Sequence, residues 1–432
     1  MVIKLKLAFR YVIIHPLYYS PRSQKSIRSF MATIIIFLLI LSLLVIVHEA
    51  GHFVLAKKFG MKVYEFGLGF PPRAGGFYRD PKTGRWKWVS GFGKREKRKE
   101  KGGFDQLKET VGGGERVEEF PGTLYSLNWL PIGGFVKIKG ESGEKANESD
   151  SFAHKKPWQR LIVLVAGVFM NVVLAAILLS IGFMIGLPTD VTEGIPKGAT
   201  LTEPPAVVVQ QVVAESPARA AGIRLGDKII SLNSEAVETA KDLTEKVREQ
   251  GAVELTLIIK RGDEELALKL TPAVLPEDTD LVPRLGILLA DAGIVRYPWY
   301  RALYQGAVAA GFSLINIFVA FYILIKNLIL GQGLAFEVSG PVGIASIVGA
   351  SARLGFNYLL NVTAMISLSL AAINILPIPA LDGGRALFVV IEKIIRRPVA
   401  LKYEQLAHTI GFVLLMILIV IVTARDILGL VR

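Results

Sequence analysis

Five stretches of the chain lack Asp, Glu, Lys and Arg over about the thickness of a bilayer. They are residues 31–47, 161–187, 302–325, 358–381 and 405–424. A helix needs about 20 apolar residues to cross the hydrocarbon core of a membrane, so each stretch predicts a candidate spanning helix. The first stretch continues into an ionisable segment that ends near residue 56, unlike a removable signal peptide.

The composition agrees with a membrane protein. Of the 432 residues, 52% are hydrophobic and only 20% are charged, and the mean hydropathy is +0.46. The chain has no cysteine, which excludes disulfides, thiolate zinc sites and cysteine nucleophiles. Its net charge of +13 does not lead us to expect a nucleic-acid partner, because excess Lys and Arg in a membrane protein normally lie in cytoplasmic loops.

Charge asymmetry between the loops predicts their sides of the membrane. Residues 57–160 contain 22 Lys and Arg against 13 Asp and Glu, whereas residues 188–298 contain 12 against 18. The first loop is therefore expected in the cytoplasm and the second outside. The basic first 30 residues oppose this scheme, which places them outside, and we let the larger loop decide.

The first apolar stretch ends in the motif HEAGH, residues 48–52. On a helix, His48 and His52 lie about 40° apart, so both imidazoles can reach one metal ion. Glu49 can then reach a water on that metal and act as the general base. The same five letters also occur in solvated surface helices. Here, however, they lie on an apolar helix, where ionisable groups without partners are costly, and this favours a functional site.

A candidate third ligand lies in the sequence NILPIPALDGGR, residues 374–385. Pro377 and Pro379 interrupt any helix, and the Gly383–Gly384 pair permits a tight backbone approach beside Asp382. A broken helix at membrane depth is tolerated where it lines protein or a water-filled cavity. The competing interpretation is a plain helix stop in which Asp382 caps the next helix.

Whether the stretch at 302–325 spans the membrane decides how many crossings separate His48 from Asp382. If it spans, Asp382 ends on the opposite side of the membrane from His48. Because the proposed chemistry needs the two to meet, we expect this stretch to lie along the interface or to re-enter, which leaves four spanning helices.

Together, HEAGH on an early apolar stretch and N-x-x-P-x-P-x-L-D-G-G on a late one resemble the site-2 protease family, in its bacterial branch with a PDZ insert. The resemblance covers the chain from about residue 40 onward. It implies that Asp382 completes a Zn²⁺ site with His48 and His52. It also implies that Asn374 holds the substrate backbone or the developing oxyanion. Residues 152–175 are similar to the second family helix, and Asn171 at its usual asparagine position is assigned to the same substrate or oxyanion group.

Other segments carry the same resemblance. Residues 66–73 and 125–141 resemble a membrane-reentrant β-hairpin, whose strand edge can pair with an unwound substrate. Residues 216–237 have the loop, helix and strand pattern of bacterial PDZ modules, which can also bind peptide termini. His15, His154 and His408 have no matching partners and are interpreted as structural.

The predicted fold is an α-helical polytopic membrane protein with about four transmembrane helices, a membrane-associated β-hairpin and an inserted α+β PDZ domain. The expected segments are a basic N-terminal segment (1–30), a first spanning helix with HEAGH (31–56), a cytoplasmic loop with the hairpin and a charged insert at 74–120 (57–160), a second spanning helix (161–187), the PDZ domain (200–273), an interfacial or reentrant helix (298–330), a third spanning helix with LDGG (358–382) and a fourth (405–424).

The resemblance implies an intramembrane zinc metalloendopeptidase of regulated intramembrane proteolysis. Its expected substrate is a transmembrane segment of a single-pass membrane protein such as an anti-sigma factor. We expect it to be multi-pass in a bacterial cell membrane, in contact with lipid, with the PDZ domain outside. The alternative is a non-catalytic membrane scaffold that holds partners through its PDZ domain and keeps zinc only for structure. A transporter is disfavoured because the sequence has no inverted repeat.

Overall fold

The computed structural model describes residues 26–90, 120–141, 143, 145–213, 216–224, 226–262, 264–274, 282–331, 339–397 and 399–431. Residues 1–25 and 91–119 lie outside the described residues, and with them lie His15, most of the basic N-terminal segment and most of the charged insert. The chain forms two compact units. One comprises residues 1–33, 175–337 and 342–366, the other residues 34–174, 338–341 and 367–432. Each is described by itself.

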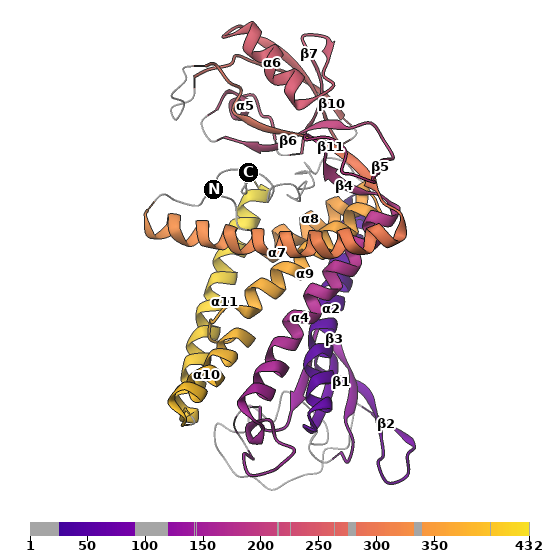
Figure 1. Cartoon of the computed structure of the whole chain (residues 1–432), viewed down its shortest axis with the longest axis vertical. Coiled ribbons are helices and arrows are strands. Elements are labelled where there is room, and N and C mark those ends of the chain that lie inside the picture. The colour runs from indigo at the N-terminus through magenta and orange to yellow at the C-terminus, as the bar shows by residue number, and fades with distance from the viewer. Residues whose placement is uncertain are drawn as a thin grey trace. The chain divides into compact units, whose positions relative to one another are not determined.

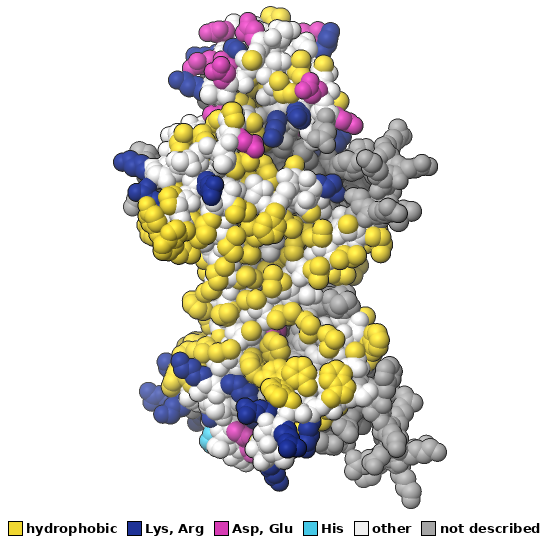
Figure 2. Space-filling model, turned by 90° about the vertical axis from the view of Figure 1, so that its right-hand side faces the viewer, with side chains coloured by type: hydrophobic (Ala, Val, Ile, Leu, Met, Phe, Trp, Pro, Cys, Tyr) yellow, Lys and Arg dark blue, Asp and Glu magenta, His cyan; other side chains and the backbone are white. Residues whose placement is uncertain are grey.

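Among the described residues, five helices are long and apolar enough to cross a membrane. They are α2 (Ser26–Lys58), α4 (Pro157–Ile185), α7 (Trp299–Ile329), α9 (Phe356–Ile375) and α11 (Leu401–Val431) (Figure 1). Many of their apolar side chains are exposed, and Figure 2 shows hydrophobic side chains dominating the middle of the face it presents. Such surfaces belong in lipid, and the protein is therefore a membrane protein.

Helix α7 is the stretch that was expected to lie along the interface. It carries a stripe of buried small residues that includes Gly306. A Cβ added at Gly306 would lie 2.5 Å from the backbone nitrogen of Ser180 in α4. Length and composition alone do not separate a crossing helix from an interfacial one, so the count of four spans stays a prediction.

The first unit contains an antiparallel sheet in the order β10-β9-β7-β6-β11-β4, with β5 beside β11 and β8 beside β7. The strands are β4 (Leu187–Asp190), β5 (Thr200–Leu201), β6 (Ala206–Val212), β7 (Lys228–Leu232), β8 (Glu235–Ala236), β9 (Leu255–Arg261), β10 (Glu264–Leu270) and β11 (Ile287–Arg296). The sheet extends past the expected PDZ limits of 200–273, because β11 pairs with β6 and β4 pairs with β11.

Two short helices accompany this sheet, α5 (Pro217–Ala220) and α6 (Ala240–Gln250). Helix α6 begins after Thr239, whose side chain accepts a hydrogen bond from the Asp242 backbone N–H at 3.0 Å. Its apolar face buries Leu243 in one cluster with Leu257 and Ile259 of β9. Alternation along β9 puts those side chains on the same face, so the region has a hydrophobic core of its own. Helix α8 (Pro341–Leu354) also belongs to this unit from Val342 onward.

The second unit contains a three-stranded antiparallel sheet in the order β2-β1-β3. Its strands are β1 (Val63–Arg79), β2 (Trp86–Ser90) and β3 (Leu124–Ile138). The two segments that resemble a hairpin therefore pair with each other, from Val63 opposite Ile138 to Tyr78 opposite Leu124. Strand β2, at the start of the charged insert, adds a third strand beside the end of β1.

Close helix packing in the second unit depends on glycine. A Cβ added at Gly51 of α2 would lie 2.7 Å from the Ala166 carbonyl carbon and 2.9 Å from the Gly167 nitrogen of α4. These two backbones therefore approach too closely for any side chain at position 51. A cluster of buried residues joins α2, β1, β3, α4 and helix α10 (Asp382–Ile395), and a 3₁₀ turn at Phe152–His154 adds Phe152 to it. The candidate site lies in this unit.

Candidate active site

The two histidines of HEAGH lie next to each other on α2. His48 and His52 are 7% and 6% exposed, and their Nε2 atoms are 3.2 Å apart. The rings meet nearly edge to face, with centroids 4.8 Å apart. Both Nε2 atoms therefore converge on one point, as helical i, i+4 spacing predicts.

Asp382 reaches the same point from near the other end of the chain. Its Oδ2 lies 2.8 Å from His48 Nε2 and 3.4 Å from His52 Nε2. Within the described part of the chain, these three residues form a group that could hold a metal ion. Zinc bonds of about 2.0–2.1 Å in a tetrahedron put ligand atoms about 3.3 Å apart, so both the spacing and the His₂Asp donor set fit a zinc ion.

The turn that carries Asp382 is built from the residues that interrupt the helix. Helix α9 ends at Ile375, shortly before Pro377, and α10 begins at Asp382. A Cβ at Gly383 would lie 2.5 Å from the Ile375 carbonyl carbon, and one at Gly384 would lie 2.8 Å from that of Ile378. The carboxylate of Asp382 faces the histidines, and Leu381 is the N-cap residue of α10. This geometry contradicts the interpretation of Asp382 as a simple cap.

The other ring nitrogen of each histidine faces α4. His52 Nδ1 donates to the Val163 carbonyl oxygen at 2.7 Å, which leaves its Nε2 lone pair free for a metal. His48 Nδ1 lies 3.4 Å from Asn171 Nδ2, and Asn171 Oδ1 is buried without a partner. Amide oxygen and nitrogen are interchangeable in such assignments. The orientation in which Asn171 Oδ1 accepts from His48 Nδ1–H would likewise free His48 Nε2.

Gly167 of α4 lies directly against the two imidazole rings. A Cβ added at Gly167 of α4 would lie 2.5 Å from His52 Nε2 and 2.7 Å from His48 Nε2. No side chain fits there without moving an imidazole. The absence of a side chain at residue 167 therefore makes room for the two nitrogen atoms.

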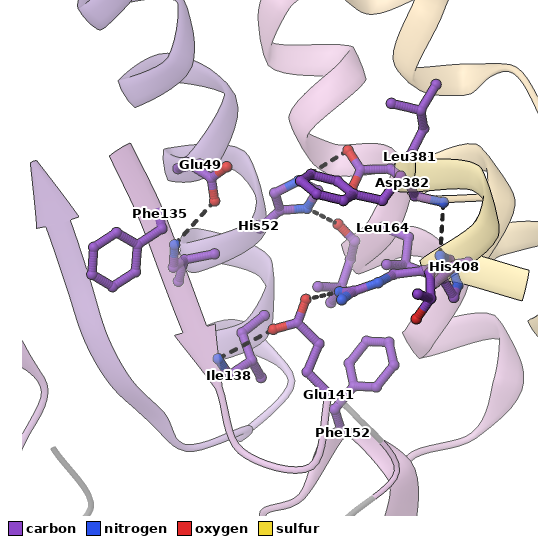
Figure 3. Close-up of a pocket in the computed structure, with 16 residues that line it drawn as sticks. Glu49, His52, Phe135, Ile138, Glu141, Phe152, Leu164, Leu381, Asp382 and His408 are labelled. Carbon is purple, nitrogen blue, oxygen red and sulfur yellow. Dashed lines mark hydrogen bonds and ion pairs between the residues drawn. The ribbon is translucent and has the colours of Figure 1, made fainter. Parts of the chain in front are cut away.

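Glu49 lines a pocket of about 510 Å³ together with His52 and Asp382 (Figure 3). Its Oε2 accepts a hydrogen bond from the Val136 backbone N–H of β3 at 3.1 Å. The pocket thus joins a carboxylate, the candidate metal ligands and the edge of a strand. Its apolar wall includes Phe135, Phe152, Val163, Leu164 and Phe412.

The two asparagines that were assigned to substrate do not line this pocket. Asn171 is 1% exposed and lies behind His48. Asn374 is half-buried in the last turn of α9. Neither is among the described residues that line the pocket.

Three charged or titratable residues of the pocket were missed from the sequence. Glu141 and Arg385 form an ion pair beside it. His408 of α11 also lines it, and its Nδ1 accepts a hydrogen bond from the Ala380 backbone N–H at 2.8 Å (Figure 3). His408 was interpreted from the sequence as structural, and the structure adds that it lines the pocket and contacts the backbone of the turn before Asp382. An ionisable residue within an apolar helix is a functional candidate by default, and that signal could have identified His408.

Comparisons with known proteins cover almost the whole chain. The model of peptidase family M50 matches residues 36–83 and 110–418. A Clostridium perfringens chain named as a candidate zinc metalloprotease is 34% identical over 91% of this chain and 98% of its own length. The regulator of sigma-W protease RasP from Bacillus subtilis is 29% identical over 92% of this chain and 99% of its own length. The zinc metalloprotease RasP from Geobacillus kaustophilus is 30% identical over 91% of this chain and 97% of its own length.

Among solved structures, the PDZ domain of an SdrC-like protein from Listeria innocua is similar to 19% of this chain and matches over 92% of its own, with 19% identity and a TM-score of 0.18. The family match and the relatives rest on the full length of the chain and agree with the convergence of His48, His52 and Asp382. The chain therefore belongs to peptidase family M50, the site-2 proteases, and is a zinc metalloprotease of the membrane.

Proposed function

We propose that the protein is an intramembrane endopeptidase that holds zinc with His48, His52 and Asp382 and cleaves transmembrane segments of single-pass membrane proteins. The observation that carries this proposal is the triangle of ligand atoms with sides of 2.8, 3.2 and 3.4 Å. Three protein ligands leave a fourth tetrahedral position open, which is typical of catalytic zinc.

A zinc ion held there would act as a Lewis acid and make water a stronger acid. His48 and His52 supply neutral donors, and the Asp382 carboxylate partly offsets the charge of the cation. Glu49 takes the proton of the attacking water and delivers it to the leaving amine. The Val136 N–H holds one carboxylate oxygen of Glu49, so the other is available for that proton transfer.

The strand beside Glu49 supports an extended substrate. In the described sheet β3 is an edge, because its sheet neighbour is β1. A peptide bond in a helix is inaccessible to the site, whereas an unwound segment can pair with a strand edge. We propose that β3 receives the substrate in this way and that Asn374 contacts its backbone or the developing oxyanion. For Asn171 we propose another role, the orientation of His48.

The cellular setting follows from the charge of the loops and from the relatives. We propose a multi-pass protein of a bacterial cell membrane whose β-hairpin and active site open toward the cytoplasm and whose PDZ domain lies outside. In this arrangement α7 lies along the interface. The name of the Bacillus subtilis relative, a regulator of sigma-W protease, supports an anti-sigma factor as the substrate class.

The first test is Glu49→Gln in protein purified in detergent and reconstituted into vesicles with a single-pass model substrate. We expect cleavage to fall by about 10²- to 10⁴-fold, because general acid–base catalysis contributes about that much. Bound zinc should stay stoichiometric, whereas His48→Ala and Asp382→Ala should lose it. Glu249→Gln, at an exposed position of α6, is the matched control. Undiminished cleavage by Glu49→Gln would refute the proposal and favour the scaffold alternative.

A further inference from the structure

The backbone just before Asp382 is held in an unusual conformation. Ala380 has a φ of +81°, in the left-handed region that glycine adopts readily and residues with a Cβ avoid. Such a residue persists only where its surroundings hold it in place. The conformation lies two residues before the carboxylate that meets His48 and His52, so whatever holds Ala380 also affects the position of Asp382.

The contact that holds Ala380 comes from α11. The Ala380 N–H donates to His408 Nδ1 at 2.8 Å, so the proton of the neutral ring lies on Nε2. Nε2 is 4.0 Å from Glu404 Oε1, and the ring packs on Phe388 of α10 with centroids 5.6 Å apart. The imidazole is thus held by its hydrogen bond to the turn and by packing on α10, while Nε2 has no hydrogen-bond partner among the described residues.

A second contact of α11 lies on the same face, three residues later. A Cβ added at Gly411 would lie 2.7 Å from the Pro379 carbonyl carbon and 2.8 Å from Pro379 Cβ. Residues three apart on a helix face the same way. His408 and Gly411 therefore hold the turn at neighbouring points, one by a hydrogen bond and the other by close packing.

From these contacts we propose that His408 is a positioning residue for the metal site. It accepts the Ala380 N–H, fixes the left-handed turn and thereby holds the Asp382 carboxylate at the point where the two imidazoles converge. This role rests on the proposed function in one respect, that Asp382 is a zinc ligand. His408 itself touches Ala380, and its effect reaches the ligand triangle through the backbone of residues 380–382.

The test compares His408→Asn with His408→Leu in the full-length protein. The two side chains branch alike, but Asn offers an acceptor where Nδ1 lies and Leu offers none. Zinc affinity, measured by competition with a chelator, should fall by about 10- to 100-fold in His408→Leu, as is usual when a partner behind a ligand is lost. In His408→Asn it should stay within about threefold of wild type. His154→Leu, which removes a more exposed histidine outside the pocket, should leave the affinity unchanged.

A second substitution distinguishes a loss of zinc affinity caused by the turn at Ala380 from one caused by general misfolding. Ala380→Gly removes the Cβ that disfavours the left-handed conformation, so the double variant His408→Leu/Ala380→Gly should regain most of the lost zinc affinity. In metal-free protein, backbone amides of residues 376–382 should exchange hydrogen faster in His408→Leu than in His408→Asn. Cleavage by His408→Leu at saturating zinc should show a lower kcat with KM little changed.

Equal zinc affinity in the Asn and Leu variants, or no recovery in the double variant, would overturn the positioning role. These readouts do not depend on proteolysis. If Glu49→Gln kept full activity while His408→Leu lost zinc, the proposed mechanism would fail and the positioning role would stand.

Discussion

The β-rich region of residues 200–296 and the proposed metal site are each stabilised by contacts of a different range along the sequence. The core of the β-rich region consists of buried residues between Val207 and Leu285, and its β9–β10 and β7–β8 hairpins join neighbouring strands. The metal site joins residues 334 positions apart in His48 and Asp382, and 111 apart in His52 and Val163. The first region has its own core, whereas the second exists only when α2, α4 and α10 have packed correctly.

This difference locates the most sensitive positions of the molecule. In the β-rich region stability is shared among many apolar side chains, so one substitution removes a fraction of it. At the proposed metal site, a few glycines lie so close to neighbouring atoms that an added Cβ would overlap with them. We therefore expect substitutions in the two regions to change different observables.

The largest effect is expected for Gly167→Ala. Its Cβ would lie within 3 Å of both Nε2 atoms, so at least one imidazole must move. Zinc affinity should fall by at least about 100-fold, matching an overpacking cost of about 3 kcal/mol, and cleavage should fall with it. Gly311→Ala in α7 is the matched control, because nothing lies within 4 Å of its added Cβ. Normal zinc affinity in Gly167→Ala would contradict the inference that no side chain fits at residue 167 without moving an imidazole.

A smaller effect, confined to the other region, is expected for Asp227→Ala. Asp227 is fully buried and accepts from Arg261 Nε at 2.8 Å and Nη2 at 2.6 Å. Removing one partner of a buried ion pair should lower the free energy of unfolding of this region by about 3 kcal/mol. Hydrogen exchange of peptides from β7 and β9 would measure it.

Two comparisons make the Asp227 result specific. Glu254→Ala breaks an exposed pair with Lys269 and should change stability by less than about 1 kcal/mol. Zinc affinity should stay at the wild-type value in both variants. A parallel loss of zinc in Asp227→Ala would show that the two regions are not independent.

The smallest effect concerns Asp291 of β11. Burial raises the pKa of its carboxyl, with a further contribution from Asp190, while the Ala240 N–H that it accepts at 2.7 Å opposes the rise. A raised pKa means that the folded form holds a proton that the unfolded form has lost. The free energy of unfolding should therefore fall as the pH rises from about 4 through the raised pKa.

Asp291→Asn keeps the acceptor for Ala240 and removes the charge. Its stability should lose this pH dependence and exceed that of the wild type at neutral pH, as measured by hydrogen exchange of β11 peptides at two pH values. If the Asn variant kept the wild-type slope, another group would be responsible.

The sequence was sufficient for the long helices, which the apolar runs predicted. The expectation that Asp382 joins His48 and His52 came from the resemblance of the two motifs to the site-2 protease family, since the residues alone left open that Asp382 caps the next helix. The limits of the β-rich region were less accessible, because β11 contains Asp291 and Gly293 and alternates poorly. Its place in the sheet depends on pairing with β6, more than 70 residues away.

The residues that lie behind the candidate ligands could not be predicted from the sequence, and the reason is a different one. Asn171 was assigned to substrate because of its place on the second family helix, whereas the structure places it behind His48, on a helix that packs closely against Gly51 of α2. The left-handed turn at Ala380 was equally hidden, since such a backbone normally indicates Gly. Only the position of α11 shows that His408 supports it.

The placement of Asp382 at the first residue of α10 also bears on when the protein becomes active. Chains are made from the N-terminus, so a nascent polypeptide that has reached residue 381 already contains both imidazoles but lacks the carboxylate. The acceptor for the Ala380 N–H is made 28 residues after that group itself. With the proposed set of ligands, the metal site therefore stays incomplete until Asp382 has been synthesised, and the proposed positioning contact from His408 forms later still.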